Sequence, residues 1–206
     1  MKKSNLSTII VIAVIGLIAI FCWSTYNKLI TAEQNVQTAW SGVENHYQMR
    51  MQLIPGLVNT VKGLAKQEKE TYIGIAEART QPVEVAAQNA QQASQGISPK
   101  GPTADQMAAY QAAQNELTRS INVVVESYPE LKMDKTFTRL MDELSSVNHE
   151  IRNSRTIFNE MTNTYNTTLL RFPANIIGSL FGFQEKPYFA ADEGAEKAPD
   201  VNFDEL

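Results

Sequence analysis

A long, largely apolar stretch near the amino terminus constrains this chain more than any other feature. It runs from Leu6 to Trp23, contains no charged side chain, and follows two lysines, Lys2 and Lys3. A helix needs roughly 20 such residues to cross the hydrocarbon of a bilayer, with about 17 as the lower limit. We therefore expect a short flank at 1–5 and a membrane anchor at 6–25.

Processing could remove or modify this stretch, and two such alternatives stay open. A cleaved secretory signal ends in a small-x-small motif, but Phe21 and Cys22 leave no small residue directly before a cut. Lipidation of Cys22, the only cysteine in the chain, would require a small residue where Phe21 stands. The sequence therefore favours an uncleaved, single-pass anchor.

Charges beside the anchor indicate how it is oriented. Lys2, Lys3 and the amino terminus precede it, whereas Lys28 follows it and is soon offset by Glu33. Because positive flanks tend to stay in the cytoplasm, the expected arrangement is a cytoplasmic amino terminus with the rest of the chain on the exported side.

A helical pattern with one buried seam follows the anchor, from Tyr26 to Arg79. Apolar positions alternate at three- and four-residue spacing, which is typical of long helices that bury a narrow stripe. One row contains Leu29, Val36, Val43, Arg50, Leu57 and Leu64, and the other contains Trp40, Tyr47, Ile54, Val61, Glu68 and Ile75. We expect a single continuous helix, which Pro55 bends without reversing the chain.

The remaining chain predicts two further long helices and a short one. Pro82 is expected to break the helix, so that 81–102 forms a weak helical tip and a flexible loop. Capping residues at Thr103 and Asp134 then open two long helices, and a short apolar segment follows at 176–183. The predicted fold is all-α: an N-terminal transmembrane helix and an elongated antiparallel up-and-down helical bundle over 26–183, with three long helices plus a short fourth.

The carboxyl-terminal segment at 184–206 differs from the rest in charge. It contains seven acidic residues against two lysines, while the remaining chain is close to neutral within a net charge of −4. This composition predicts a disordered acidic tail. Because the chain has no basic stripe, nucleic acid is excluded as a partner.

Motifs that carry catalysis or bind cofactors are missing from the sequence. His46 and His149 are the only histidines, and neither has a second ligand at helical zinc-site spacing. No nucleophile motif or glycine-rich phosphate loop occurs either. The sequence therefore predicts a protein that is not an enzyme and has no cofactor or metal.

Two charged residues occupy seam positions where apolar residues are expected. Arg50 lies close to Pro55, and an interior ion pair with Glu150 or a bond to the carbonyl of Met51 would satisfy it. A partner- or ligand-binding role is the alternative, and the same two interpretations apply to Glu68. Arg50, Pro55 and Glu68 are therefore candidate structural or partner-contact residues.

Specific motifs in the chain resemble the LemA family of bacterial membrane proteins. The matching motifs are Tyr26-Asn27, Ala39-Trp40-Ser41, 50–58, Glu77-Ala78-Arg79, 155–159, Tyr165-Asn166, Phe172-Pro173 and Gly182-Phe183. The resemblance covers roughly residues 24–189 and implies a single anchor followed by an antiparallel helical bundle. It adds four candidate structural or partner-contact residues, which are Arg155, Asn159, Tyr165 and Asn166.

The resemblance implies no enzymatic activity, since the family has no agreed biochemical function. Its members are associated with envelope stress, with membrane proteases and with magnetosome formation. We therefore expect a non-enzymatic scaffold or adaptor in the bacterial inner membrane, with a membrane or envelope protein as its partner. The alternative is a regulator that senses the state of the envelope and couples to a protease or transport partner. The sequence leaves open whether the protein forms a homo-oligomer.

Overall fold

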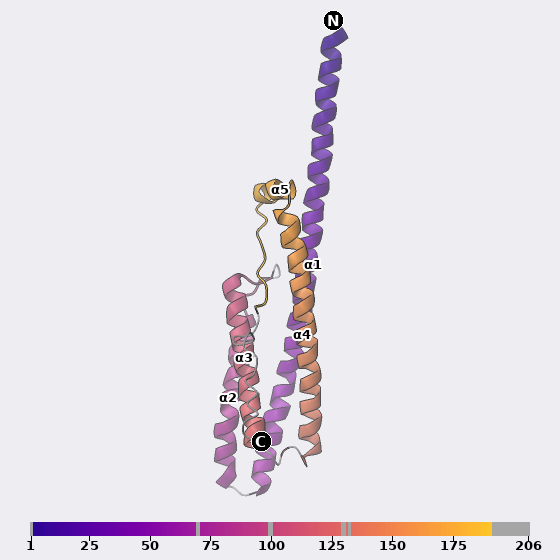
Figure 1. Ribbon diagram of the computed structural model, residues 1–206. Coiled ribbons are helices and arrows are strands. Elements are labelled where there is room, and N and C mark those ends of the chain that lie inside the picture. The colour runs from indigo at the N-terminus through magenta and orange to yellow at the C-terminus, as the bar shows by residue number, and fades with distance from the viewer. Residues whose placement is uncertain (1, 69–70, 99–100, 129–130, 132, 191–206) are drawn as a thin grey trace, which may run out of the picture.

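The computed structural model describes residues 2–68, 71–98, 101–128, 131 and 133–190 of this chain. Within them it contains five helices and no strand beyond one isolated bridge (Figure 1). The helices are α1 (Lys2–Glu68), α2 (Thr71–Ser94), α3 (Ala104–Ser127), α4 (Lys135–Leu170) and α5 (Ala174–Phe181). The predicted all-α class is thus confirmed.

Helix α1 runs the whole length of the molecule, and the other helices gather around its later part (Figure 1). Its amino-terminal portion projects alone beyond the bundle. Helix α4 lies antiparallel along α1, and α2 and α3 form a second antiparallel pair beside the end of the bundle farthest from the amino terminus. The short helix α5 lies across the other end of the bundle, next to the point where α1 emerges.

The expected single helix from Tyr26 to Arg79 is wrong, because α1 ends at Glu68 and α2 runs back antiparallel from Thr71. The three- and four-residue spacing continues in α2, where Val83 and Ala90 are buried. Two antiparallel helices whose buried residues have the same spacing cannot be distinguished from one long helix by that spacing alone. The only local signal of the reversal is the polar run at 66–70.

Both prolines of this region lie inside helices. Helix α1 continues through Pro55, as predicted, without reversing the chain. The predicted break at Pro82 is wrong, because α2 extends from Thr71 to Ser94 around it. Pro82 is exposed, so water can satisfy the carbonyl of Ala78 that its ring deprives of a partner, while the burial of neighbouring residues such as Val83 holds the helix together.

The predicted helix starts at Thr103 and Asp134 are confirmed. The Thr103 side chain accepts a hydrogen bond from the Gln106 backbone N–H, and the Gln106 side-chain oxygen accepts one from the Thr103 backbone N–H, which completes a capping box. The Asp134 carboxylate accepts a hydrogen bond of 2.8 Å from the backbone N–H of Phe137. These caps fix where α3 and α4 begin.

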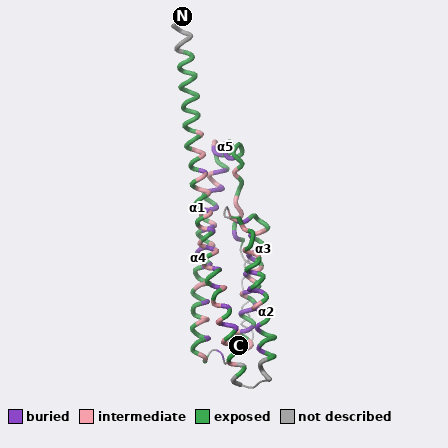
Figure 2. Tube along the Cα trace, turned by 180° about the vertical axis from the view of Figure 1, so that it is seen from behind, coloured by how far each residue is buried: buried purple, intermediate pink, exposed green. Residues whose placement is uncertain are grey.

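The buried seam residues form two separate cores along the bundle. The buried positions are coloured purple on the helices in Figure 2. The core nearer α5, which we call the aromatic core, contains Leu29, Val36, Trp40, Val43, Tyr47, Met107, Tyr110, Ile151, Phe158, Tyr165, Leu169, Ala174, Ile177 and Phe189. The second, which we call the aliphatic core, contains Ile54, Leu57, Val58, Val61, Val83, Ala86, Ala87, Ala90, Leu117, Ile121, Val124, Leu131, Phe137 and Leu144.

The expected disorder of the acidic segment is wrong for its first part. Residues 184–190, which we call the strap, turn back from α5 and run beside α4 (Figure 1). Phe189 of the strap is only 6% exposed and belongs to the aromatic core. Burial of this ring and hydrogen bonds to α4 hold the strap in place. The rest of the predicted disordered tail, 191–206, lies outside the described residues.

Candidate functional site

A buried polar layer surrounds Arg50, which is 4% exposed. Its Nη1 donates hydrogen bonds to Thr118 Oγ1 at 3.0 Å and to Asn148 Oδ1 at 3.4 Å. Its Nη2 donates to the backbone oxygen of Gln114 at 3.1 Å and to that residue's side-chain oxygen. The expected partner Glu150 is exposed instead, so the guanidinium is held by neutral groups from α3 and α4.

Burial dominates the electrostatics of this layer. Desolvation lowers the pKa of Arg50 from its ordinary value, while the neighbouring Tyr47 and Tyr110 oppose that shift. The guanidinium also lies over the Tyr47 ring, 5.2 Å from its centroid. A cavity of about 230 Å³ adjoins Arg50, and Arg152 lines it as well. The arrangement ties α1, α3 and α4 together at one height, which fixes the register of the bundle.

Two asparagines of α4 hold the strap through paired hydrogen bonds. Asn159 donates to the backbone oxygen of Phe189 at 3.2 Å and accepts from its N–H at 2.9 Å. Asn166 makes the same pair with Lys186, at 2.9 Å in both directions. Each side-chain amide thus satisfies both backbone groups of one strap residue, as a neighbouring β-strand would.

The spacing of these contacts explains why they match. Asn159 and Asn166 are seven residues apart on a helix, about 10.5 Å at 1.5 Å per residue. Lys186 and Phe189 are three residues apart, about 10 Å in an extended chain at roughly 3.3 Å per residue. The side-chain amides of Asn159 and Asn166, two helical turns apart, are therefore spaced to match Phe189 and Lys186 of an extended strap that runs antiparallel to α4.

Further side chains fasten the two ends of the strap. The Tyr165 hydroxyl donates to the backbone oxygen of Gln184 at 2.9 Å, and burial together with the nearby Glu33 raises the Tyr165 pKa to about 12. Arg155 donates to the Ala190 oxygen at 3.1 Å, and its guanidinium lies 4.8 Å from the centre of the Phe189 ring. These contacts hold the strap against the aromatic core, to which Phe189 belongs.

An ion pair ties the strap to α1 as well. The ammonium of Lys186 lies 2.9 Å from the carboxylate of Glu33, and both side chains are 16% exposed. Through Glu33 on α1 and Asn166 on α4, Lys186 bridges the two longest helices of the bundle.

The structure therefore separates the candidate residues into groups. Four of them meet at the strap, namely Arg155, Asn159, Tyr165 and Asn166. Arg50 lies apart from them in the polar layer, and Pro55 lines a groove farther along α1. Glu68 is the last residue of α1, and its side chain lies outside the described residues.

Sequence reasoning missed the partners of these residues. Gln114 and Thr118 in α3, and Lys186 in the strap, were not singled out. The available signals were weak: Gln114 is a polar residue at a seam position, and Phe189 is an aromatic residue in a segment with an acidic net charge. A pairing partner far along the chain leaves no local pattern, so only the fold reveals it.

Open grooves along the bundle surface include two that α1 helps to line. The larger, about 820 Å³, lies between α1, α2 and α3 and is lined mainly by polar side chains such as Glu44, Gln48 and Gln91. The smaller, about 370 Å³ and mostly apolar, lies between α1 and α4 and includes Gly42 and Ile157. Among the described residues, no three His, Cys, Asp or Glu side chains gather in a way that could hold a metal ion.

Helix α1 is the one helix in the described part of the chain that is long and apolar enough to cross a membrane. Its most apolar 18-residue window has a mean hydropathy of 2.5, and none of that window is buried. Fold and site together thus define a membrane-associated protein, in which a helix with a candidate membrane span continues into a strapped helical bundle.

The particular family follows from comparison with known proteins. The LemA family model matches residues 39–203, so the chain belongs to the LemA family. The chain is 26% identical to magnetosome protein MamQ 2 of Paramagnetospirillum magneticum over 195 residues, which cover 89% of this chain and 71% of the relative. It is 24% identical to magnetosome protein MamQ of Magnetospirillum gryphiswaldense over 202 residues, covering 92% and 74% respectively.

Proposed function

We propose that this protein is a non-enzymatic, single-pass scaffold of the bacterial inner membrane, which holds an elongated helical bundle at a fixed position for a membrane or envelope protein to bind. The observation that carries the proposal is the continuity of α1 from Lys2 to Glu68. One helix contains both the candidate membrane span and the buried seam of the bundle. The membrane therefore fixes the height at which the bundle begins, because the bundle cannot move independently of the anchor.

The dimensions of the helix support this role. The 43 residues of α1 from Tyr26 to Glu68 extend about 65 Å at 1.5 Å per residue. The strap and the polar layer stiffen the rod, because they tie α1 to α4 at two heights. The strongest polar contacts of the site thus serve the shape of the molecule, which is what a scaffold requires.

Site-specific photocrosslinking in cells tests the proposal. A photoreactive side chain at Ile157, which is 43% exposed in the apolar groove between α1 and α4, should capture membrane or envelope proteins. The same group at Val85, which is 47% exposed on α2, is the matched control on another face. Failure to recover any membrane or envelope protein from either position would contradict the scaffold proposal.

The same cross-links distinguish a scaffold from an envelope-stress regulator. A static scaffold should give the same pattern before and after envelope stress, whereas a regulator should change its cross-links. A cysteine at Ser98, in a Cys22→Ser background, reports the side of the membrane. With the bundle on the exported side, as the flanking lysines favour, an impermeant thiol reagent labels it once any outer membrane is permeabilised.

A further inference from the structure

Helix α5 leaves one apolar face uncovered. Phe172, just before it, is 80% exposed, and within it Ile176 is 59%, Leu180 77% and Phe181 58% exposed. Isolated apolar residues on a surface are ordinary, but a contiguous group on one short helix marks an interaction site. We call these four residues the α5 face.

The opposite side of α5 is fixed to the bundle. Ala174, Ile177 and Gly178 are buried, and a Cβ atom on Gly178 would collide with the side chain of Leu169 at the end of α4. The helix therefore packs closely on α4 and cannot turn its apolar face inward. The backbone itself holds the α5 face toward the outside.

The position of α5 relative to the anchor indicates what covers this face. The Tyr26 ring lies 4.9 Å from the Phe181 ring and 5.8 Å from the Phe183 ring, centre to centre. Tyr26 is only three residues beyond Trp23, the end of the apolar stretch, which is about 4.5 Å along the helix. Phe181 thus lies at the height where the anchor leaves the hydrocarbon.

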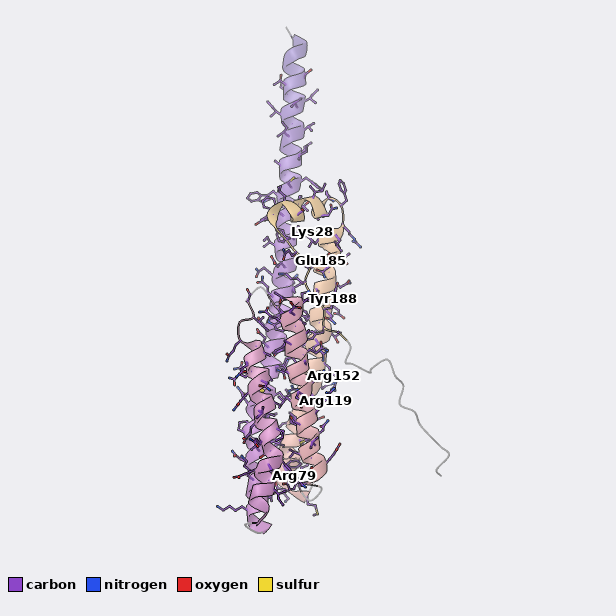
Figure 3. All side chains as sticks on the ribbon, turned by 90° about the vertical axis from the view of Figure 1, so that its left-hand side faces the viewer. Lys28, Arg79, Arg119, Arg152, Glu185 and Tyr188 are labelled. Atoms are coloured by element: carbon purple, nitrogen blue, oxygen red, sulfur yellow. The ribbon has the colours of Figure 1, made fainter. Side chains whose placement is uncertain are left out.

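The direction of α5 fits the same surface. In Figures 1 and 3 it lies across the axis of α1, so it is parallel to the plane of a membrane that α1 crosses. Helices of this kind bury their apolar face about 5–10 Å into the boundary between headgroups and acyl chains. Two exposed cations, Lys28 and Arg171, flank the contact, and they suit anionic headgroups.

We propose that α5 is an interfacial helix whose apolar face inserts into the lipid surface beside the anchor, so that the protein stands on the membrane at two points. The anchor alone would leave α1 free to tilt and to rotate about its axis. A second contact to one side of α1 restricts both motions, which sets the direction in which each groove of the bundle faces. This inference rests on the proposed membrane span of α1.

Depth-dependent quenching tests the inference on the full chain. A Leu180→Cys variant in a Cys22→Ser background carries an environment-sensitive fluorophore and is reconstituted in vesicles of phosphatidylethanolamine and phosphatidylglycerol at about 3:1. Spin-labelled lipids place the quencher either near the headgroups or deep in the acyl chains. We expect several-fold stronger quenching by the shallow label than by the deep one, and the same result for Phe172→Cys.

Two controls make the outcomes separable. Met133, at the opposite end of the bundle, is apolar and 84% exposed, so a probe at Met133→Cys should not be quenched by either lipid. A probe at Ile12→Cys, within the anchor, should be quenched best by the deep label. An unquenched Leu180 probe beside a quenched Ile12 probe overturns the interfacial helix and leaves the anchor standing, whereas an unquenched Ile12 probe overturns the anchor and with it the proposed function.

Discussion

The two cores of the bundle differ in amino-acid composition. Six of the fourteen residues in the aromatic core are Trp, Tyr or Phe, against only Phe137 in the aliphatic core. The aliphatic core is enclosed by α1, α2, α3 and α4, whereas the aromatic core has α1, α4, the start of α3, the short helix α5 and the strap around it. Each aromatic side chain buries about 150–250 Å². A few large rings thus supply much of the buried area where the short helix α5 and the strap stand in place of a long helix.

The polar layer lies at the boundary between these cores. Along α1 the order is Tyr47 in the aromatic core, Arg50, and then Ile54 in the aliphatic core. Along α3 the corresponding order is Tyr110, Gln114 and Leu117. The buried charge therefore replaces one level of apolar packing and sets a single register, because a shifted helix would leave the guanidinium unpaired.

Removing Trp40 should be the most damaging single change to the aromatic core. Its ring contacts Tyr110 and Phe158 at 5.6 Å each, and stacks on Phe189 of the strap at 6.0 Å. Trp40→Ala should lower the free energy of unfolding by about 3–5 kcal/mol, measured by denaturant titration in detergent. Leu117→Ala in the aliphatic core should also destabilise, but it should leave amide exchange in the strap slow. Equal acceleration of strap exchange by both variants would contradict the separation of the cores.

The second-largest loss of stability is expected from a change in the polar layer around Arg50. Arg50→Met keeps an apolar stem but leaves the buried side-chain oxygen of Gln114 without this donor, at about 1–3 kcal/mol for an unsatisfied group. We expect a loss of about 2 kcal/mol in the free energy of unfolding by the same titration. Arg152→Met is the control, because it lines the same cavity but is exposed, and it should cost less than about 0.5 kcal/mol. A larger effect for Arg152 would show that the layer does not stabilise the bundle.

Alkaline pH should weaken the aromatic core selectively. Burial and Glu33 raise the Tyr165 pKa to about 12 from an ordinary value of 10.0. The folded state therefore holds this proton more tightly than the unfolded state, so the stabilisation is fully present below pH 10 and is lost between about pH 10 and 12. Each pKa unit corresponds to about 1.4 kcal/mol. Unfolding midpoints followed across this range should converge on those of Tyr165→Phe, and parallel pH profiles for the two proteins would refute the assignment.

Removing the side chain of one asparagine on α4 should loosen the strap without unfolding the bundle. Asn159→Ala removes both hydrogen bonds to Phe189, at about 1 kcal/mol for each net bond. Amide exchange at Phe189 should accelerate about tenfold or more in hydrogen–deuterium exchange, because local opening becomes easier. Asn153→Ala on the exposed side of α4 is the matched control and should leave that exchange unchanged. Unchanged exchange in the Asn159 variant would mean that the ring of Phe189 holds the strap alone.

The two cores and the polar layer between them also show what the sequence could predict. Seam periodicity correctly marked Arg50 and Trp40 as buried, because burial on a helix follows from spacing alone. The partners of Arg50 could not be predicted, since the height at which α3 stands beside α1 depends on the whole bundle. The α1–α2 reversal was missed for a related reason, because two antiparallel arms keep the same period as one helix.

The strap was missed for a different reason. Composition predicted disorder from residue 184 onward, since acidic residues dominate the segment as a whole. The structure shows that Phe189 and the backbone groups facing Asn159 and Asn166 suffice to hold residues 184–190. The family resemblance drew attention to both asparagines, but a motif does not say what its residues bind.

The smallest expected difference between the two regions concerns their ion pairs. Lys186 and Glu33 beside the aromatic core are 16% exposed each, whereas Lys62 and Glu84 beside the aliphatic core are 34% and 44% exposed. Because solvent and salt screen exposed pairs, Glu33→Gln should cost about 0.5–1 kcal/mol of unfolding free energy, and Glu84→Gln less than about 0.5 kcal/mol. Denaturant titrations at low and at molar salt measure both. The Glu84 effect should vanish in high salt while part of the Glu33 effect persists, and the reverse order would mean that the strap does not shield its ion pair from solvent.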